Sequence, residues 1–364
     1  MGKAHATSQV YLIRAEGSEP AETLAAKAKK VYLATGFNDL IAEGDFAALK
    51  IHFGESGNAG YIKPAWLTGL IWEVRTRTKH AFLTDSNTLY VGNRSNSIDH
   101  LRLAWSHGFT PEATGVPIII ADGLIGRDKQ EPKSAQSRTA SSKIASAILD
   151  ADAFIGLAHV TGHVQTGLGA AIKNMGMGCA SRAGKLDQHS VTHPRVSAKQ
   201  CRNCSICMSF CPEAAIVQAE GHVVIEPARC IGCGECLVVC KHGAIKMKWD
   251  EDSLRLQEKM AEYAFRVFSH FQGKAVFVSF LIQVTKDCDC MSKSQKRIVE
   301  DVGILASLDP VAIDQATAEL LTVRAGGRDP LRAGYDIDWS GQLVHGERMG
   351  LGSRRYKLVE IVYS

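Results

Sequence analysis

Short apolar runs alternate with longer amphipathic stretches along most of the chain. The runs have the length of β-strands, and the longer stretches repeat their apolar residues at helical spacing. Strands separated by helices of this length pair in parallel through right-handed crossovers, so the pattern predicts an α/β fold with a doubly wound, mostly parallel sheet and helices on both faces. The predicted strands are 47–53, 81–84, 117–121, 153–158, 274–284 and 303–307, and the predicted helices are 20–34, 64–75, 98–107, 141–149, 252–271 and 310–321.

A cysteine repeat interrupts this alternation. Eight of the eleven cysteines form two copies of the spacing C-x2-C-x2-C-x3-C. The first three thiolates of such a run reach three irons of one cubane, and the fourth points toward a second cluster. The spacing therefore predicts an inserted two-cluster ferredoxin-like module at 197–249, with a strand pair at 215–217 and 223–225, between the α/β segments 1–196 and 250–364. The predicted ligands are Cys201, Cys204, Cys207 and Cys240 for one [4Fe-4S] cluster, and Cys230, Cys233, Cys236 and Cys211 for the other.

Structural zinc is the alternative use of Cys-x2-Cys pairs. A tetrahedral zinc site needs two such pairs, so the third x2 step of each run is left without a role. We therefore expect clusters. An odd cysteine total with this spacing also fits a reducing compartment, where disulfides are rare.

Composition and charge narrow the function classes further. The 42 basic and 38 acidic residues are interspersed and give a net charge of +4, unlike the basic stripe of a nucleic-acid binder. The first ten residues lack the apolar core of a signal peptide, and the longest apolar stretch, near 275–284, has about half the length of a membrane span. We expect a soluble, cytoplasmic protein that binds neither nucleic acid nor membrane.

Polar residues follow the predicted strands. Ligands of an open parallel sheet bind at the carboxyl ends of its strands, so these residues are candidates for chemistry. Each aspartate could equally be the N-cap of the following helix. A glycine-rich segment, 162–185, carries lysines and could hold an anion, although simple loop flexibility explains its glycines as well. The catalytic candidates are Lys50, His52, Asp85, Asp122, Lys173 and Asp309.

Cysteines and histidines outside the repeat raise the question of a third metal. Two thiolates one residue apart can chelate a transition metal, and histidines at ligand-like spacing could complete the site. The alternative is that the remaining cysteine is a small buried apolar residue and the histidines contact loops or an anion. The candidate ligands are Cys288, Cys290, His159, His163 and Cys179.

Several long segments carry a family resemblance. The chain resembles a family of bacterial and archaeal iron-sulfur centre proteins of the domain-of-unknown-function 362 type, with an embedded two-[4Fe-4S] ferredoxin module. The resemblance covers nearly the whole chain and implies an α/β body that carries two clusters. The segments are ALKIHFGE (48–55), FLTDSN (82–87), ADGL (121–124), GAAIKNMGMGCA (169–180), CDC (288–290) and VGILASLDPVAID (302–314).

Two functions remain open from the sequence. In the first, the protein is an electron carrier whose clusters exchange electrons with a redox partner protein while the α/β body docks a partner or ligand. In the second, it is an oxidoreductase whose body binds a small anionic substrate or an additional metal ion at the strand ends and receives electrons from the clusters. A weaker third class is a cluster-assembly factor that holds cargo on Cys288 and Cys290. The carrier is preferred because it requires only what the cysteines indicate, and self-association as a homodimer stays open.

Overall fold

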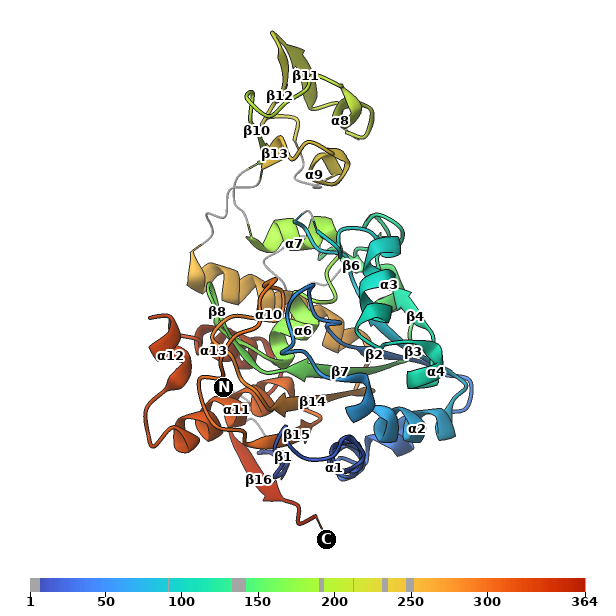
Figure 1. Cartoon of the computed structure of the whole chain (residues 1–364), viewed down its shortest axis with the longest axis vertical. Helices are drawn as coiled ribbons and strands as arrows, with labels where there is room; N and C mark the ends of the chain where they lie inside the picture. The colour runs from blue at the N-terminus through green and yellow to red at the C-terminus, as the bar shows by residue number, and fades with distance from the viewer. Residues whose placement is uncertain are drawn as a thin grey trace.

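A mixed sheet of eight strands forms the centre of the computed structural model, which describes residues 7–90, 92–132, 142–189, 193–211, 213–230, 235–246 and 252–363. Seven of the eight strands point the same way, and β15 is antiparallel to both of its neighbours. The prediction of a mostly parallel α/β sheet is therefore confirmed (Figure 1). In sheet order the strands are β16 Tyr356–Glu360, β1 Ser8–Ile13, β15 Gly303–Ser307, β14 Ala275–Leu281, β7 Ala153–His159, β2 Phe46–Lys50, β3 His80–Asp85 and β4 Ile118–Ile120.

Helices cover both faces of this sheet, and an apolar core lies under each layer. Successive residues of β14 alternate between the cores: Phe277 packs in the first and Val278 in the second, and both are fully buried. A strand that is buried on both faces is apolar throughout, which is why the sequence shows continuous runs. The first core includes residues of α5 Ser146–Leu149, α6 Ala171–Gly176, α10 Ser253–His270, α11 Pro310–Arg324, α12 Pro330–Gly334 and α13 Gly341–Met349; the second includes residues of α1 Ala21–Leu33, η1 Phe37–Leu40, η2 Pro64–Trp66, α2 Thr68–Arg77 and α3 Ser97–Ser106.

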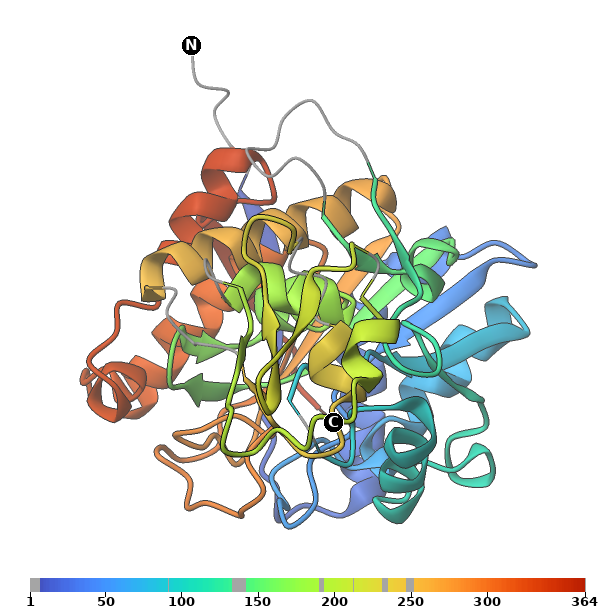
Figure 2. The same cartoon turned by 90° about the horizontal axis from the view of Figure 1, so that it is seen from above.

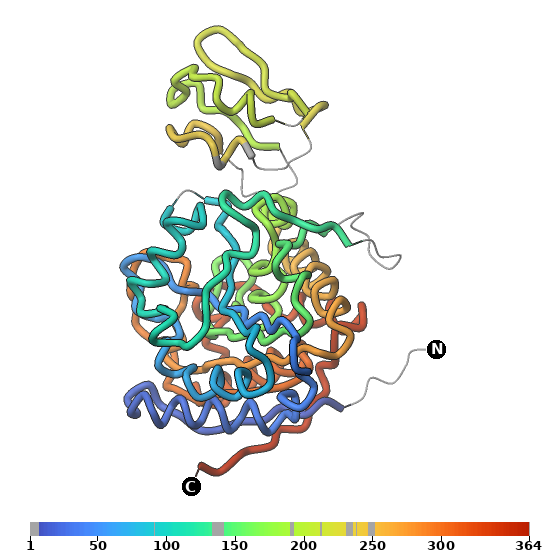
Figure 3. Tube along the Cα trace, turned by 90° about the vertical axis from the view of Figure 1, so that its right-hand side faces the viewer, coloured from blue at the N-terminus to red at the C-terminus, as the bar shows by residue number. Residues whose placement is uncertain are grey.

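The cysteine-rich segment forms a small unit beside this body. Its hairpin joins β11 Ile216–Ala219 to β12 His222–Ile225, and β10 Arg195–Val196 pairs with β13 Ile245–Lys246 where the segment begins and ends. Two short helices, α8 Ile206–Ser209 and α9 Glu235–Val239, carry part of the cysteine repeat. Figures 1 and 3 show the unit at one end of the molecule next to α7 Arg182–His189, far from β16, and Figure 2 shows it in front of the body.

Contacts between the small unit and the body involve two leucines of the body. Leu89, from the loop after β3, and Leu186, from α7, are buried in the same apolar cluster as Cys207 and Cys236. The guanidinium of Arg127 also lies 4.8 Å from the centre of the Phe210 ring, a cation–π contact across the boundary. The small unit therefore packs on the loop after β3 and on α7.

Several predicted elements differ from the structure. The predicted helix 141–149 is helical only at Ser146–Leu149, because β6 Ile144–Ala145 precedes it and pairs with β5 Lys129–Gln130. Strand β1, the hairpin of β8 Thr161–His163 and β9 Gly167–Gly169, and the helices α4 Pro111–Thr114, α7, α12 and α13 were not predicted. The domain limits at 197 and 249 stay a prediction, and the second limit lies outside the described residues.

Candidate functional site

Four cysteines surround one small cavity in the cysteine-rich segment. The cavity has a volume of about 20 Å³ and is lined by Cys201, Cys204 and Cys207 from the first run and by Cys240 from the end of the second. Burial raises the pKa of the Cys207 thiol, and the nearby thiolates of Cys240, Cys201 and Cys204 act in the same direction. These side chains therefore lie close enough to interact, and they are the set predicted to hold one cluster.

Backbone amides point at several of these sulfurs. The amide of Asn203 donates to Cys201 Sγ over 3.4 Å, and the amide of Ala244 donates to Cys240 Sγ over 3.3 Å. Asn203 and Ser205 both have positive φ, so the chain bends on either side of Cys204. Amide donors stabilise thiolates and tune cluster potentials, so the four residues fit a [4Fe-4S] cluster.

The second predicted set is described in part. Cys236 is buried, and Cys211 and Cys230 are partly buried. The amide of Ala215 donates to Cys211 Sγ over 3.2 Å, the counterpart of the bond to Cys240. Cys233 lies outside the described residues.

A buried ion pair joins the ends of two neighbouring strands. Lys50 ends β2 and Asp85 ends β3, and the Lys50 Nζ lies 2.9 Å from Asp85 Oδ1 although the side chains are only 1% and 4% exposed. Asn174 of α6 accepts a second hydrogen bond from the Lys50 Nζ at 2.9 Å. Burial by itself raises the pKa of Asp85, but the charge of Lys50 and the contact with His100 outweigh it and hold the pKa well below its ordinary value. The Asp85 carboxylate is therefore ionised.

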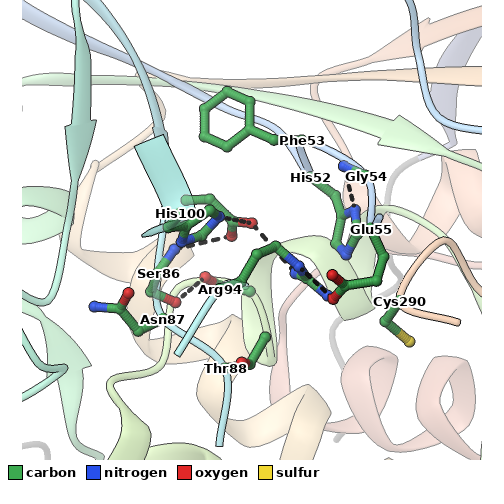
Figure 4. Close-up of polar contacts among 12 residues, drawn as sticks. His52, Phe53, Gly54, Glu55, Ser86, Asn87, Thr88, Arg94, His100 and Cys290 are labelled. Atoms are coloured by element: carbon green, nitrogen blue, oxygen red, sulfur yellow. Dashed lines mark hydrogen bonds and ion pairs between the residues drawn. The ribbon is translucent and has the colours of Figure 1, made fainter. Parts of the chain in front are cut away.

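Arg94 extends this pair toward the loop after β2. Its Nε lies 3.1 Å from Glu55 Oε2, and its NH1 lies 3.9 Å from the second oxygen of Asp85. Arg94 also donates to the Tyr90 hydroxyl at 2.5 Å. Figure 4 shows His52, Glu55, Arg94 and His100 grouped around the ends of these strands. We call the end of the sheet where β2, β3, β4, β7 and β14 terminate the carboxyl edge.

Asp122 and Lys185 form the part of the carboxyl edge that faces the cysteine-rich segment. Asp122 Oδ1 accepts from the amide and the side chain of Asn87, each at 2.9 Å, and burial raises its pKa to about 6. The Lys185 Nζ donates to Ser86 Oγ at 2.5 Å and to the carbonyls of Asn87 and Ala180 at 2.8 Å. Burial lowers the pKa of Lys185 to about 8.

Lys173 lies at the carboxyl edge without a counter-ion in contact. Its ammonium makes no hydrogen bond or ion pair with any described residue, and burial lowers its pKa to about 8. Two histidines lie near it. Burial holds the pKa of His52 and the pKa of His163 well below the ordinary value, and the charge of Lys173 acts on both in the same direction. Both imidazoles are therefore neutral.

Asp309 does not belong to this group, so its predicted placement is wrong. It follows β15, which is antiparallel to β14 and therefore ends at the opposite end of the sheet. Its carboxylate caps α11 by accepting from the amides of Val311 and Ala312, and it also accepts from Ser8 Oγ and the Ser353 amide. The N-cap interpretation of this aspartate is the one that the structure supports.

The five candidate ligands of a third metal are not arranged as a metal site. Cys288 and Cys290 are joined by a disulfide, and no group of three or more His, Cys, Asp or Glu side chains within the described ranges could hold a single metal ion. His159 Nδ1 lies 2.8 Å from Asp289 Oδ2 and its Nε2 lies 2.8 Å from the Ile282 carbonyl. Cys179 is buried, and burial raises its pKa to about 12. A third metal stays a prediction without a matching arrangement.

Sequence reasoning missed several members of the carboxyl edge as functional candidates. Arg94 and His100 come from an irregular segment and a helix that carry no strand-end signal. Asn174 and Lys185 both lie in the glycine-rich segment 162–185, whose sequence indicates only glycines and positive charge. The sequence signal that could have found them is the density of polar residues in two stretches, 85–100 and 173–189.

Comparison with known proteins gives a family match that spans both the body and the cysteine-rich segment. The family described as Domain of unknown function (DUF362) matches residues 47–319, which include the central strands and the cysteine repeat. The chain belongs to this family. The description of the family names no substrate.

Named relatives match only a short part of the chain. Electron transport protein HydN of Escherichia coli (strain K12) is 40% identical over 53 residues, 14% of this chain and 30% of HydN. An iron-sulfur protein of Rhodospirillum rubrum is 45% identical over 51 residues, 14% of this chain and 27% of that protein. The chain thus spans about a third or less of these relatives' lengths.

One solved structure overlaps more of the chain at low similarity. The lactate racemase apoprotein from Thermoanaerobacterium thermosaccharolyticum aligns with 76% of this chain and 51% of its own, at 12% identity and a TM-score of 0.39. As to membranes, the described helices include none that combines the length and the apolar character of a membrane span.

Proposed function

We propose that this protein transfers electrons through two [4Fe-4S] clusters and that its α/β body docks a partner or ligand at the carboxyl edge. One observation carries the proposal: the cavity lined by Cys201, Cys204, Cys207 and Cys240. A single run of the repeat would supply three neighbouring thiolates, and the fourth comes from the end of the other run, as crossed ligation requires.

The second predicted ligand set is Cys230, Cys233, Cys236 and Cys211. Each cluster, when bound, takes up and releases one electron at a time. The amide bonds to Cys201, Cys240 and Cys211 supply donors beside the sulfurs, and such donors favour the reduced, more negative state.

A second candidate function is an oxidoreductase that reduces or oxidises an anionic substrate at the carboxyl edge. The contact between the small unit and the body favours it. Leu89 and Leu186 pack against the cluster cysteines, and the neighbouring residues Asn87 and Lys185 belong to the carboxyl edge. A plain carrier has no need to place its clusters beside a network of buried charges.

Cysteine variants test the crossed ligation. Cys240→Ser and Cys201→Ser should abolish the same electron paramagnetic resonance signal of the reduced protein, whereas Cys211→Ser and Cys230→Ser should abolish the other. Anaerobically purified protein should contain about eight irons and eight sulfides per chain. Cys179→Ser is the matched control, because this thiol is buried in the body, and it should retain both signals. Stoichiometric zinc, or loss of the same signal in Cys240→Ser and Cys230→Ser, contradicts the proposal.

Electron uptake with and without a small molecule separates the two candidate functions. A carrier should be reduced by a low-potential donor and reoxidised by an acceptor protein equally well in the wild type and in His163→Ala. An oxidoreductase should lose turnover with its substrate in this variant while both cluster signals persist. Retained turnover in His163→Ala contradicts the oxidoreductase.

A further inference from the structure

Charge is unevenly compensated at the carboxyl edge. Lys50 contacts Asp85, and Arg94 contacts Glu55. Lys185 is held by a hydroxyl and two carbonyl oxygens. Lys173 is the cation of this group for which the described residues supply no hydrogen-bond acceptor and no carboxylate within contact distance. Lys173 is partly buried, and a partly desolvated ammonium without a partner favours an anion beside it.

His52 places a donor in the same region. Its Nδ1 accepts a hydrogen bond from the Gly54 amide at 3.0 Å, so the proton of the neutral ring resides on Nε2. That Nε2 is buried and has no hydrogen-bond partner within the described part of the chain. A buried donor without an acceptor destabilises a folded protein, and an acceptor from outside the chain would remove that cost.

His163 repeats this arrangement from another element. Its Nδ1 accepts from the amides of Gln165 and Thr166 at 3.2 and 3.1 Å, which again leaves the ring proton on Nε2. His52 follows β2, and His163 ends β8 in the hairpin that leads into α6, the helix that carries Lys173. Three donors of hydrogen bonds therefore come from separate elements. Asn174, next to Lys173, bonds the Lys50 carbonyl two residues before His52, and Gly169, in the same hairpin as His163, lies against the Lys173 stem, so the three side chains belong to one region.

Neighbouring groups fix the position of Lys173. Asn174, the next residue, donates to the carbonyls of Lys50 and Leu157 over 3.2 and 3.1 Å and thereby ties α6 to the ends of β2 and β7. Gly169 lies against the stem of Lys173, since a Cβ there would come within 3.3 Å of the lysine Cδ. Among the carboxylates, Asp289 has the largest electrostatic effect on Lys173, but the Asp289 carboxylate already contacts His159.

We propose that Lys173, His52 and His163 bind a small carboxylate or oxyanion at the carboxyl edge. The anion accepts from the Lys173 ammonium and from the two Nε2 donors, so each group that lacks a partner gains one. The neutral histidines donate without adding charge, which suits an anion of low charge. This inference deepens the ligand-binding role proposed for the body, but its donors all belong to the body and it requires neither cluster.

Thermal unfolding of the full protein under anaerobic conditions, with the clusters oxidised, tests the proposal. Acetate and inorganic phosphate serve as probes of the carboxylate and the oxyanion, with potassium chloride at equal ionic strength as the reference. A bound ligand stabilises the folded state in proportion to the logarithm of its concentration above Kd. We expect the Tm of the wild type to rise with at least one probe relative to chloride.

Two sets of variants make the assignment specific. Lys173→Met should raise the Tm without anion, because it removes an uncompensated cation, and should weaken the apparent anion affinity at least tenfold. His52→Leu should weaken the affinity while His52→Gln retains part of it, because glutamine keeps a donor. Lys357→Met, an exposed lysine on β16, should respond as the wild type does.

Two results would overturn the proposal. One is a wild-type Tm that responds to neither probe beyond chloride. The other is an anion response that Lys173→Met and His52→Leu both leave unchanged. Because binding is measured with oxidised clusters, either result is separate from the cluster ligation tested above: intact resonance signals with no anion response would leave electron transfer standing without this site.

Discussion

The ion pair between Lys50 and Asp85 gives the sharpest stability prediction. Both side chains are almost fully buried, and their charged atoms are 2.9 Å apart. Removal of one partner from a buried pair leaves an uncompensated charge, which costs about 3–5 kcal/mol. Asp85→Asn strands the Lys50 ammonium with the Asn174 side chain as its remaining acceptor, so we expect the full effect.

Lys50→Met should cost less than Asp85→Asn. The carboxylate of Asp85 that remains lies 3.6 Å from His100 Nε2 and 3.9 Å from the Arg94 guanidinium, and both can compensate part of its charge. We expect a loss near ~3 kcal/mol, at the lower end of the range. The double variant removes both charges, so its loss should fall short of the sum of the single losses by roughly 2–3 kcal/mol.

Urea unfolding followed by tryptophan fluorescence measures these changes. Trp66 is buried and stacks near Phe280 in the second core, so its emission reports on the body. The slope of the free energy against urea should stay constant among the variants. The matched control is the exposed pair of Arg14 and Glu360, whose side chains are 56% and 49% exposed, and a cycle there should give a coupling below about 1 kcal/mol. Additive losses at Lys50 and Asp85 would refute the reasoning.

Three further predictions concern protonation and thiols. The pKa of Lys173 is lowered from 10.5 to about 8, so the charged lysine destabilises the folded state below pH 8, and this cost disappears as the pH rises toward 10.5. Lys173→Met should therefore raise the free energy of unfolding by ~2 kcal/mol at pH 7 and leave it unchanged at high pH. A gain that does not depend on pH contradicts this prediction. Burial lowers the pKa of His159, but the Asp289 carboxylate outweighs it and raises the pKa above 6.5. The contact between the two side chains therefore stabilises the folded state fully below pH 6.5, and this contribution is lost as the pH rises through the folded pKa. Asp289→Asn should move the imidazole titration, followed by nuclear magnetic resonance, below 6.5. Two of the eleven cysteines form the disulfide, so denatured protein freed of iron should show nine free thiols, and two more after reduction. Eleven free thiols before reduction contradict the disulfide.

The central sheet could be predicted because most of its strands are buried on both faces. Such strands appear as apolar runs, and β7 and β14 were placed within a few residues on that signal. Strand β1 has a different pattern: Ser8 and Gln9 are partly or fully exposed at its start, and its pairing with β15 and β16 depends on residues about 300 positions away. No local pattern encodes such a partner.

The antiparallel direction of β15 explains the error at Asp309. The expectation that residues after the strands gather at one edge holds only if all strands run the same way. β15 follows β14 after the connection 282–302, which contains no named helix, and a connection without a crossover helix is the feature that favours antiparallel pairing. The partners of Lys50 were also inaccessible from the sequence, since Asn174 reaches it from more than a hundred residues away.

Contacts at Leu89 and Leu186 bear on the choice between carrier and oxidoreductase. These leucines pack against Cys207 and Cys236, while Lys185, one residue before Leu186, bonds Ser86 and Asn87 at the carboxyl edge. A change of charge at bound clusters would therefore act on Lys185 across a short apolar layer, where electrostatic effects are weakly screened. Reduction should then raise the proton affinity of Lys185, which couples electron uptake to proton uptake at the edge. A carrier gains nothing from this coupling, whereas an enzyme that reduces a bound anion requires both.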